Sequence, residues 1–70
     1  MWCEGDACDA IDIEWHAESR QYRIRNRGTK PVEVSLKRLA GAISLTLQPG
    51  ETRLADLSGF EYPYSANFQP

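Results

Sequence analysis

Two apolar–polar alternations on either side of a turn, between residues 21 and 36, constrain this fold more than any other feature. In QYRIRN, Tyr22 and Ile24 alternate with arginines, and VEVSL repeats the alternation from Val32 onward. A period of two is typical of half-buried strands. The intervening GTKP follows an Asn-Arg pair, and Asn, Gly and Pro favour turns. The stretch therefore predicts two strands joined tightly.

The segment IDIEWH alternates in the same way and predicts a further strand at residues 11–16, followed by a polar loop at 17–20. A hairpin with this four-residue loop matches apolar residues on its buried face and opposite charges on its exposed face. The apolar pairs are Ile13–Ile24 and Trp15–Tyr22, and the charged pairs are Glu14–Arg23 and Asp12–Arg25. Each charged pair contributes about 0.2–1 kcal/mol. A shift of one residue would destroy both kinds of match, so we expect this register.

Three more strands are predicted at residues 43–48, 52–57 and 62–68, with a bulge or bend near Arg38. The sequence Gln-Pro-Gly-Glu at 48–51 indicates a type II turn. Gly28 and Gly50 are both expected at positive φ. Pro63 has no N–H to donate, which places the last strand at a sheet edge.

Six short strands separated by turn signals predict an all-β fold, a small six-stranded antiparallel β-sandwich or a partly open barrel. Residues 1–10 read as an irregular, cysteine-containing leader, and residues 11–70 as a single β-domain. The expected core consists of Ile11, Ile13, Trp15, Tyr22, Ile24, Val32, Val34, Leu36, Ile43, Leu45, Leu47, Leu54, Tyr64 and Phe68.

A chain of 70 residues forms one domain at most, and a domain of this size buries only about 60% of its unfolded surface. Apolar residues make up 41% of the chain and charged residues 26%, as in ordinary globular proteins. Apolar runs are too short for a membrane span or a secretory signal. We therefore expect a cytoplasmic protein if Met1 is native, and a periplasmic or secreted one if a signal was trimmed.

Two elements carry a resemblance to a known family. The stretch from Asn26 to Val34 reads NRGTKPVEV, and Leu47 to Thr52 reads LQPGET. They resemble the Asn-x-Gly-x-x-Pro-Val-x-Val and Leu-x-Pro-Gly-Glu elements of small bacterial immunoglobulin-like β-sandwiches, such as the C-terminal accessory domain of bacterial phospholipase C enzymes. The resemblance covers residues 11–57 and implies an immunoglobulin-like fold. Such domains are usually appended to larger proteins and mediate contacts, but turn residues imply no particular activity.

Cys3 and Cys8 are the first candidates for chemistry. In an exported protein they can close a small disulfide, and in a reducing compartment they stay unpaired thiols. As a zinc site they supply two ligands, fewer than structural zinc needs. The neighbouring acids disfavour a thiolate nucleophile. We expect a possible disulfide and no metal.

His16 is the single histidine in the sequence, so any Ser–His or Cys–His catalysis would require it. It shares a predicted strand face with Asp12 and Glu14, which suggests a metal site, but arginines expected across that face oppose a cation. No phosphate-binding glycine loop, nucleophile elbow or zinc-protease motif occurs in the sequence. We therefore expect a solvated histidine at a strand end, no catalytic residue and no cofactor.

Seven bases lie between residues 20 and 38, whereas residues 1–18 hold six acids and no base. The basic stretch could bind nucleic acid with Tyr22 as a stacking residue. However, the expected register turns Tyr22 inward and pairs two arginines with acids, and the net charge is −2. The asymmetry is therefore better explained as strands that match each other, and we expect no nucleic-acid partner.

The C-terminal segment is dense in aromatic residues, and period-two alternation can bury one set of them. The candidate binding residues are Phe60, Tyr62, Tyr64 and Phe68. Exposed aromatics would form a docking patch for a protein or glycan; alternatively, they close the open end of the sandwich. We expect a non-enzymatic domain that binds another macromolecule, with a protein as the partner. The alternatives are a structural or accessory domain of a bacterial envelope or secreted protein, a nucleic-acid binder, and a thiol or metal enzyme.

Overall fold

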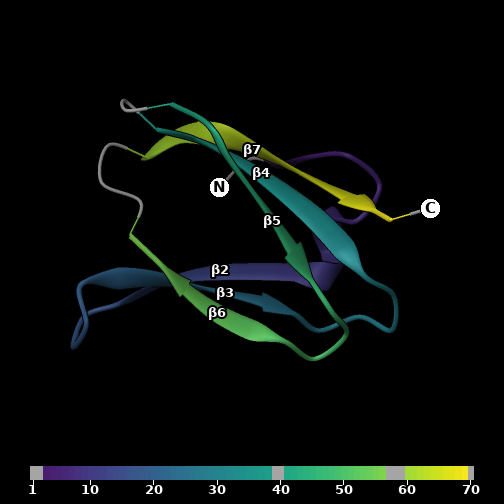
Figure 1. Cartoon of the computed structure of the whole chain (residues 1–70), viewed down its shortest axis with the longest axis horizontal. Coiled ribbons are helices and arrows are strands. Elements are labelled where there is room, and N and C mark those ends of the chain that lie inside the picture. Colours follow the sequence, from purple (N-terminus) through teal and green to yellow (C-terminus); the bar gives the residue numbers. More distant parts are fainter. Residues whose placement is uncertain (1–2, 39–40, 57–59, 70) are drawn as a thin grey trace.

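The structure, a computed structural model, describes residues 3–38, 41–56 and 60–69, without the side chains of residues 38 and 60–63. In this part of the chain, two β-sheets pack face to face as a sandwich (Figure 1). The strands are β1 (Cys3–Glu4), β2 (Ile11–His16), β3 (Gln21–Asn26), β4 (Val32–Arg38), β5 (Ile43–Leu47), β6 (Thr52–Ala55) and β7 (Phe60–Phe68), and a 3-10 turn, η1, spans Cys8–Ala10. One sheet has the order β1-β7-β4-β5 and the other β2-β3-β6. The predicted all-β sandwich is confirmed, and the sheets are not closed into a barrel.

The β2–β3 hairpin has the predicted register. Ile13 pairs with Ile24 and Trp15 with Tyr22, while Glu14 lies opposite Arg23 and Asp12 opposite Arg25. A four-residue loop connects the strands, and its last residue, Arg20, has a φ of +56°. Apolar matching on one face and charge matching on the other thus select the same pairing, as expected for a half-buried sheet.

The core lies between the sheets and contains most of the residues predicted for it. Eight of them are buried: Ile11, Ile13, Ile24, Val32, Val34, Leu36, Leu47 and Tyr64. The half-buried Tyr22, Ile43 and Leu45 pack against this core. Two small residues that the sequence did not single out, Ala7 and Ala66, are also buried.

Three predicted core residues are wrong, because Trp15, Leu54 and Phe68 are substantially exposed. Leu54 pairs with Arg23, whose side chain is on the outer face, so Leu54 shares that face. Trp15 and Phe68 follow the inward alternation, but each lies at or next to the end of its strand. There the opposite sheet covers the side chain incompletely.

The two turn glycines differ from each other. Gly50 has a φ of +78°, as predicted, and the Glu51 N–H donates to the Gln48 carbonyl at 2.9 Å. Gly28 does not have a positive φ, so its prediction is wrong. Its N–H instead donates to Asn26 Oδ1 at 2.9 Å, so a side chain closes this turn without left-handed backbone. A Cβ at Gly28 would lie 3.1 Å from the Ala10 Cβ, which makes small size the constraint there.

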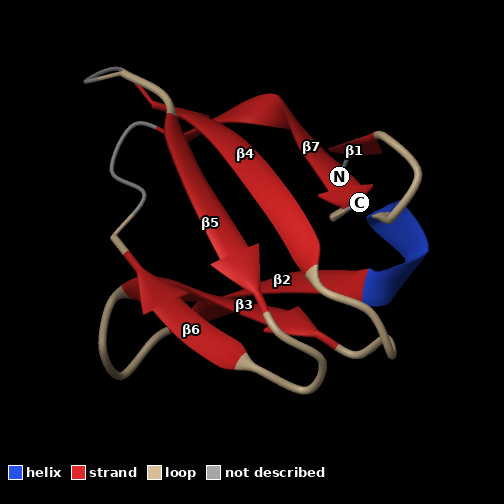
Figure 2. Ribbon diagram, turned by 45° about the vertical axis from the view of Figure 1, so that its right-hand side comes forward, coloured by secondary structure: helices blue, strands red, loops and turns tan. Residues whose placement is uncertain are grey.

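Residues 3–10 are more ordered than the irregular leader expected from the sequence. Strand β1 runs parallel to β7, with Cys3 beside Tyr64 and Glu4 beside Ser65, and η1 then leads into β2 (Figure 2). Strand β7 therefore has β1 on one side and β4 on the other, and its predicted edge position is wrong. The β4–β7 register shifts between Ser35 and Lys37, close to the bulge predicted near Arg38. Residues 62–64 lie in this irregular stretch, which tolerates the missing N–H of Pro63.

Candidate functional site

The most exposed large apolar side chain among the described residues is Trp15, which is 56% exposed. Its ring contacts Tyr22 edge-to-face, with 5.2 Å between the ring centroids. Trp15 lies near the end of β2, and β2 is an edge strand with β3 as its neighbour in the sheet. We call this surface, made of Trp15, Tyr22 and the outer edge of β2, the Trp15 rim. Among the described residues, no strand pairs with the outer side of β2. An apolar ring beside such an edge can accept a partner's side chains and main chain together.

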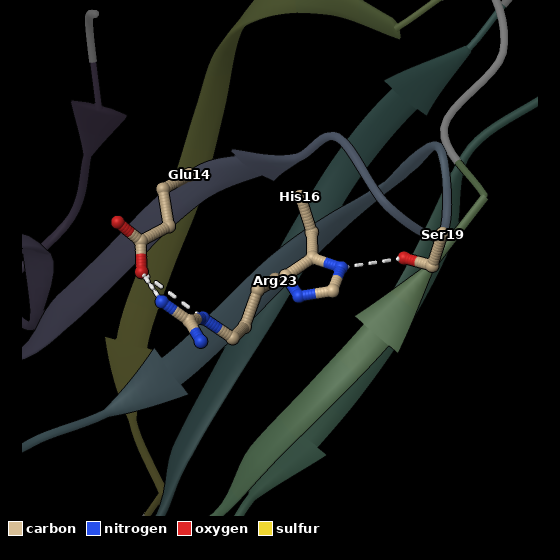
Figure 3. Close-up of polar contacts among 4 residues, drawn as sticks. All are labelled: Glu14, His16, Ser19 and Arg23. Atoms are coloured by element: carbon tan, nitrogen blue, oxygen red, sulfur yellow. Dashed lines mark hydrogen bonds and ion pairs between the residues drawn. The ribbon is translucent and has the colours of Figure 1, made fainter.

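An ion pair flanks the Trp15 rim on the outer face of the three-stranded sheet. Arg23 Nε donates to Glu14 Oε1 at 3.0 Å, and Arg23 Nη2 contacts the same oxygen (Figure 3). The hydrogen bond from Arg23, and then its charge, lowers the pKa of Glu14. Both side chains are about half exposed, so water and salt screen the attraction. The pair fixes the orientation of charges on this face more than it stabilises the fold.

The same face has a shallow hollow of about 180 Å³, lined by Asp12, Glu14, Arg23, Arg25 and Thr52. Asp12 lies across from Arg25 in the register, but its carboxylate approaches Arg27 instead, with 3.7 Å between Oδ2 and Nε. Within the described part of the chain, no ion pair of Arg25 occurs. The hollow thus combines acids and bases, which suits polar contacts at an interface margin more than a buried active site.

His16 contacts Ser19 across the β2–β3 loop, with 2.8 Å between Nδ1 and Oγ (Figure 3). A serine beside a histidine is the smallest unit of nucleophilic catalysis. Here, however, Ser19 is exposed on a loop, and neither residue lines the charged hollow. The contact holds the hairpin loop together, and His16 at the strand end is half buried and bonded to Ser19 instead of being fully solvated. Among the described residues, no group of three or more His, Cys, Asp and Glu could hold a metal ion.

The predicted C-terminal aromatic patch is not assembled by the described side chains. Tyr64 is buried in the core, and Phe68 is 36% exposed with Lys30 Nζ 5.7 Å from its ring centroid. The side chains of Phe60 and Tyr62 lie outside the described residues. Of the two candidate residues whose side chains are described, Tyr64 and Phe68, Phe68 alone is exposed enough to contact a partner. Sequence reasoning missed Trp15 as a surface residue, although its place next to a polar loop was the available signal.

Cys3 and Cys8 are joined by a disulfide, with 5.9 Å between their Cα atoms. In this state neither sulfur is a thiolate, so neither is available as a nucleophile or a metal ligand. Comparisons with protein-family models, curated proteins and solved structures found no match to this chain. In the part of the chain that is described, no helix has the length and apolar character needed to cross a membrane.

Proposed function

We propose that this chain is a non-catalytic β-sandwich domain that binds a protein partner through the Trp15 rim. The observation that carries the proposal is the 56% exposure of Trp15 on an edge strand. Tryptophan is enriched among the residues that dominate binding energy. Complete burial of an aromatic side chain removes roughly 150–250 Å² from water, and a partner can still cover the 56% of Trp15 that is exposed. A partner that covers this ring gains that burial without unfolding the core.

The chemistry around the rim favours a protein over a nucleic acid. Glu14 and Asp12 each lie beside an arginine on the adjacent face, so the local charge is mixed instead of basic. Mixed rim charges contribute orientation and association rate more than affinity. The unpaired edge of β2 can add an extended strand of a partner, a common mode of peptide recognition. Phe68, which is 36% exposed, stands as a second, separate contact candidate.

A second candidate function is that of a structural or accessory domain in a bacterial envelope or secreted protein. The Cys3–Cys8 disulfide favours it, because disulfides persist mainly in oxidising compartments. The immunoglobulin-like turn motifs support it as well. In that case the Trp15 rim would contact another part of the same larger protein, and the chemistry of the contact would be unchanged.

The proposal is tested by substituting Trp15→Ala and, as the matched control, Leu54→Ala, which removes an exposed apolar side chain from the outer face. A photo-crosslinking residue is placed at a loop position beside β2 in both variants. In extracts of the producing organism we expect both variants to remain folded, with Trp15→Ala losing about 0.5–1.5 kcal/mol of aromatic-pair stability. Trp15→Ala should lose a discrete crosslinked protein that Leu54→Ala retains. Equal crosslinking by both variants would refute the Trp15 rim, and recovery of nucleic acid would refute a protein partner.

A further inference from the structure

The outer edge of β7 is covered by residues 3–8, which we call the strap. Beyond the parallel β1–β7 pairing, three further hydrogen bonds hold the strap to β7. They run from the Ala7 N–H to the Ala66 carbonyl (3.0 Å), from the Phe68 N–H to Asp6 Oδ1 (2.8 Å) and from the Asp6 N–H to Asn67 Oδ1 (3.3 Å). Backbone groups of β7 that would otherwise face solvent are thereby satisfied.

The strap fits β7 so closely that one of its positions admits only glycine. Gly5 has a φ of +117°, a conformation that L side chains rarely adopt. A Cβ built there would collide with the Ala66 carbonyl and lie 2.7 Å from Asn67 Oδ1. Two residues later, Ala7 is 1% exposed and belongs to the core. The strap therefore docks in one geometry and cannot shift along the edge.

The disulfide closes this strap upon itself. Cys3 begins β1 and Cys8 begins η1, so the link joins the two ends of the segment that bonds to β7. Both cysteines are half buried and pack against the hydrophobic core. The disulfide ring limits the conformations of the undocked strap and so favours the docked state. For a loop of about six residues, the loop-entropy relation predicts that the disulfide raises the docking equilibrium constant by on the order of 40-fold.

We propose that reduction of the Cys3–Cys8 disulfide releases the strap and uncovers the edge of β7 while the sandwich stays folded. The reductant is a dithiol. One of its thiolates attacks one cysteine sulfur, the Cys3–Cys8 S–S bond breaks, the other cysteine leaves as a thiolate, and a mixed disulfide forms. The second thiolate of the dithiol then displaces the remaining protein thiol. The dithiol is oxidised by two electrons to a disulfide, and Cys3 and Cys8 take up the electrons and protons as two thiols. This inference is independent of the Trp15 rim.

Amide hydrogen exchange, followed by NMR on the full chain with and without dithiothreitol, tests the proposal. The reporters are the Ala7 and Phe68 amides, and the controls are the Asn26 and Gly50 amides, which donate to the Glu51 and Asn26 carbonyls. We expect reduction to accelerate exchange of the reporters by about 40-fold and of the controls by less than about threefold. Unchanged reporters would overturn the proposal. An equal rise in the exchange rates of all four amides would also overturn it, because the disulfide would then stabilise the whole domain and not the strap alone.

Two glycine variants distinguish the contribution of strap docking from that of the disulfide. Gly5 and Gly41 have φ values of +117° and +116°, but a Cβ at Gly41 meets nothing within 4 Å. The two Ala variants thus share the same backbone strain, and Gly5→Ala alone adds a collision with β7. With the disulfide intact, Gly5→Ala should accelerate exchange at Ala7 and Phe68, and Gly41→Ala should leave both amides protected. Protection of both amides in Gly5→Ala would refute the strap as the cover.

Discussion

Asn26 is the one buried polar side chain among the described residues, with 0% exposure, and its removal yields a sharp test of the fold. Its Nδ2 donates to the Lys30 carbonyl at 2.8 Å and to the Leu47 carbonyl at 3.0 Å, and its Oδ1 accepts from the Gly28 N–H at 2.9 Å. One amide group at the end of β3 thereby joins the turn before β4 to the end of β5. These bonds connect the two sheets.

The substitution Asn26→Asp keeps the shape of the side chain and the acceptor for Gly28. It removes both donors, so the Lys30 and Leu47 carbonyls lose their partner, at roughly 1–3 kcal/mol each. The expected loss is therefore about 2–6 kcal/mol before the cost of a buried charge is added. A domain of this length has a total stability of roughly 3.5–10 kcal/mol. The variant should consequently be close to unfolding at neutral pH.

Urea denaturation followed by far-UV circular dichroism measures the effect. With a slope of about 1 kcal/mol per molar urea, the midpoint should fall by about 2 M or more. Asn67→Asp is the comparison for the added charge, because Asn67 is exposed and its acceptor oxygen for the Asp6 N–H is retained, so its loss should stay well below that of Asn26→Asp. Burial raises the pKa of a carboxyl at position 26 above its unfolded value. The loss of stability in Asn26→Asp should therefore be smallest below the pKa that the new carboxyl has in the unfolded chain. It should grow as the pH rises through the pKa of that carboxyl in the folded protein. Equal midpoints for the two variants at pH 7 would refute this reasoning.

Two further predictions concern the turns and the charged face. Gly50→Ala should cost about 1 kcal/mol because the alanine is strained in the left-handed conformation. Gly28→Ala should instead be destabilised by crowding against Ala10. In double-mutant cycles measured by urea denaturation, Ala10→Gly should therefore restore stability to Gly28→Ala and not to Gly50→Ala. Because Arg23 lowers the pKa of Glu14, this pair stabilises the fold above the unfolded pKa of Glu14, and its contribution is lost as pH falls through the folded pKa. Arg23→Gln should raise the pKa of Glu14 in an NMR carboxyl titration, and an unchanged titration would contradict the assigned cause.

The sequence predicts the β2–β3 hairpin well because its register is specified twice. Ile13 opposite Ile24 and Glu14 opposite Arg23 are independent matches that agree, and both partners lie close together in the chain. The turn at Gly50 is likewise local, since Pro-Gly chemistry alone fixes its backbone. These features need no knowledge of the other sheet.

Features that depend on distant contacts could not be predicted in this way. Strand β1 has two residues and pairs with β7 at the other end of the chain, so no periodicity marks it. The prediction of an edge position from Pro63 failed for the same reason. For Trp15, alternation indicates the side of the sheet correctly, but not how far the facing sheet extends over it. The sequence therefore predicts binding residues among the C-terminal aromatics, of which Tyr64 is buried, and does not predict the exposure of Trp15.

Strands β7 and β2 differ in how their outer sides are protected, and this contrast supports the proposed working surface. Proteins usually protect exposed strand edges by covering them or by placing charges along them. The edge of β7 is covered by the strap, through backbone and side-chain bonds. Strand β2 carries charges at Asp12 and Glu14, but its end presents the half-exposed ring of Trp15. An apolar ring at the less protected edge costs solubility and contributes little to the core. A partner that covers this ring would offset that cost, which is why we propose binding at β2 and regulation by redox state at β7.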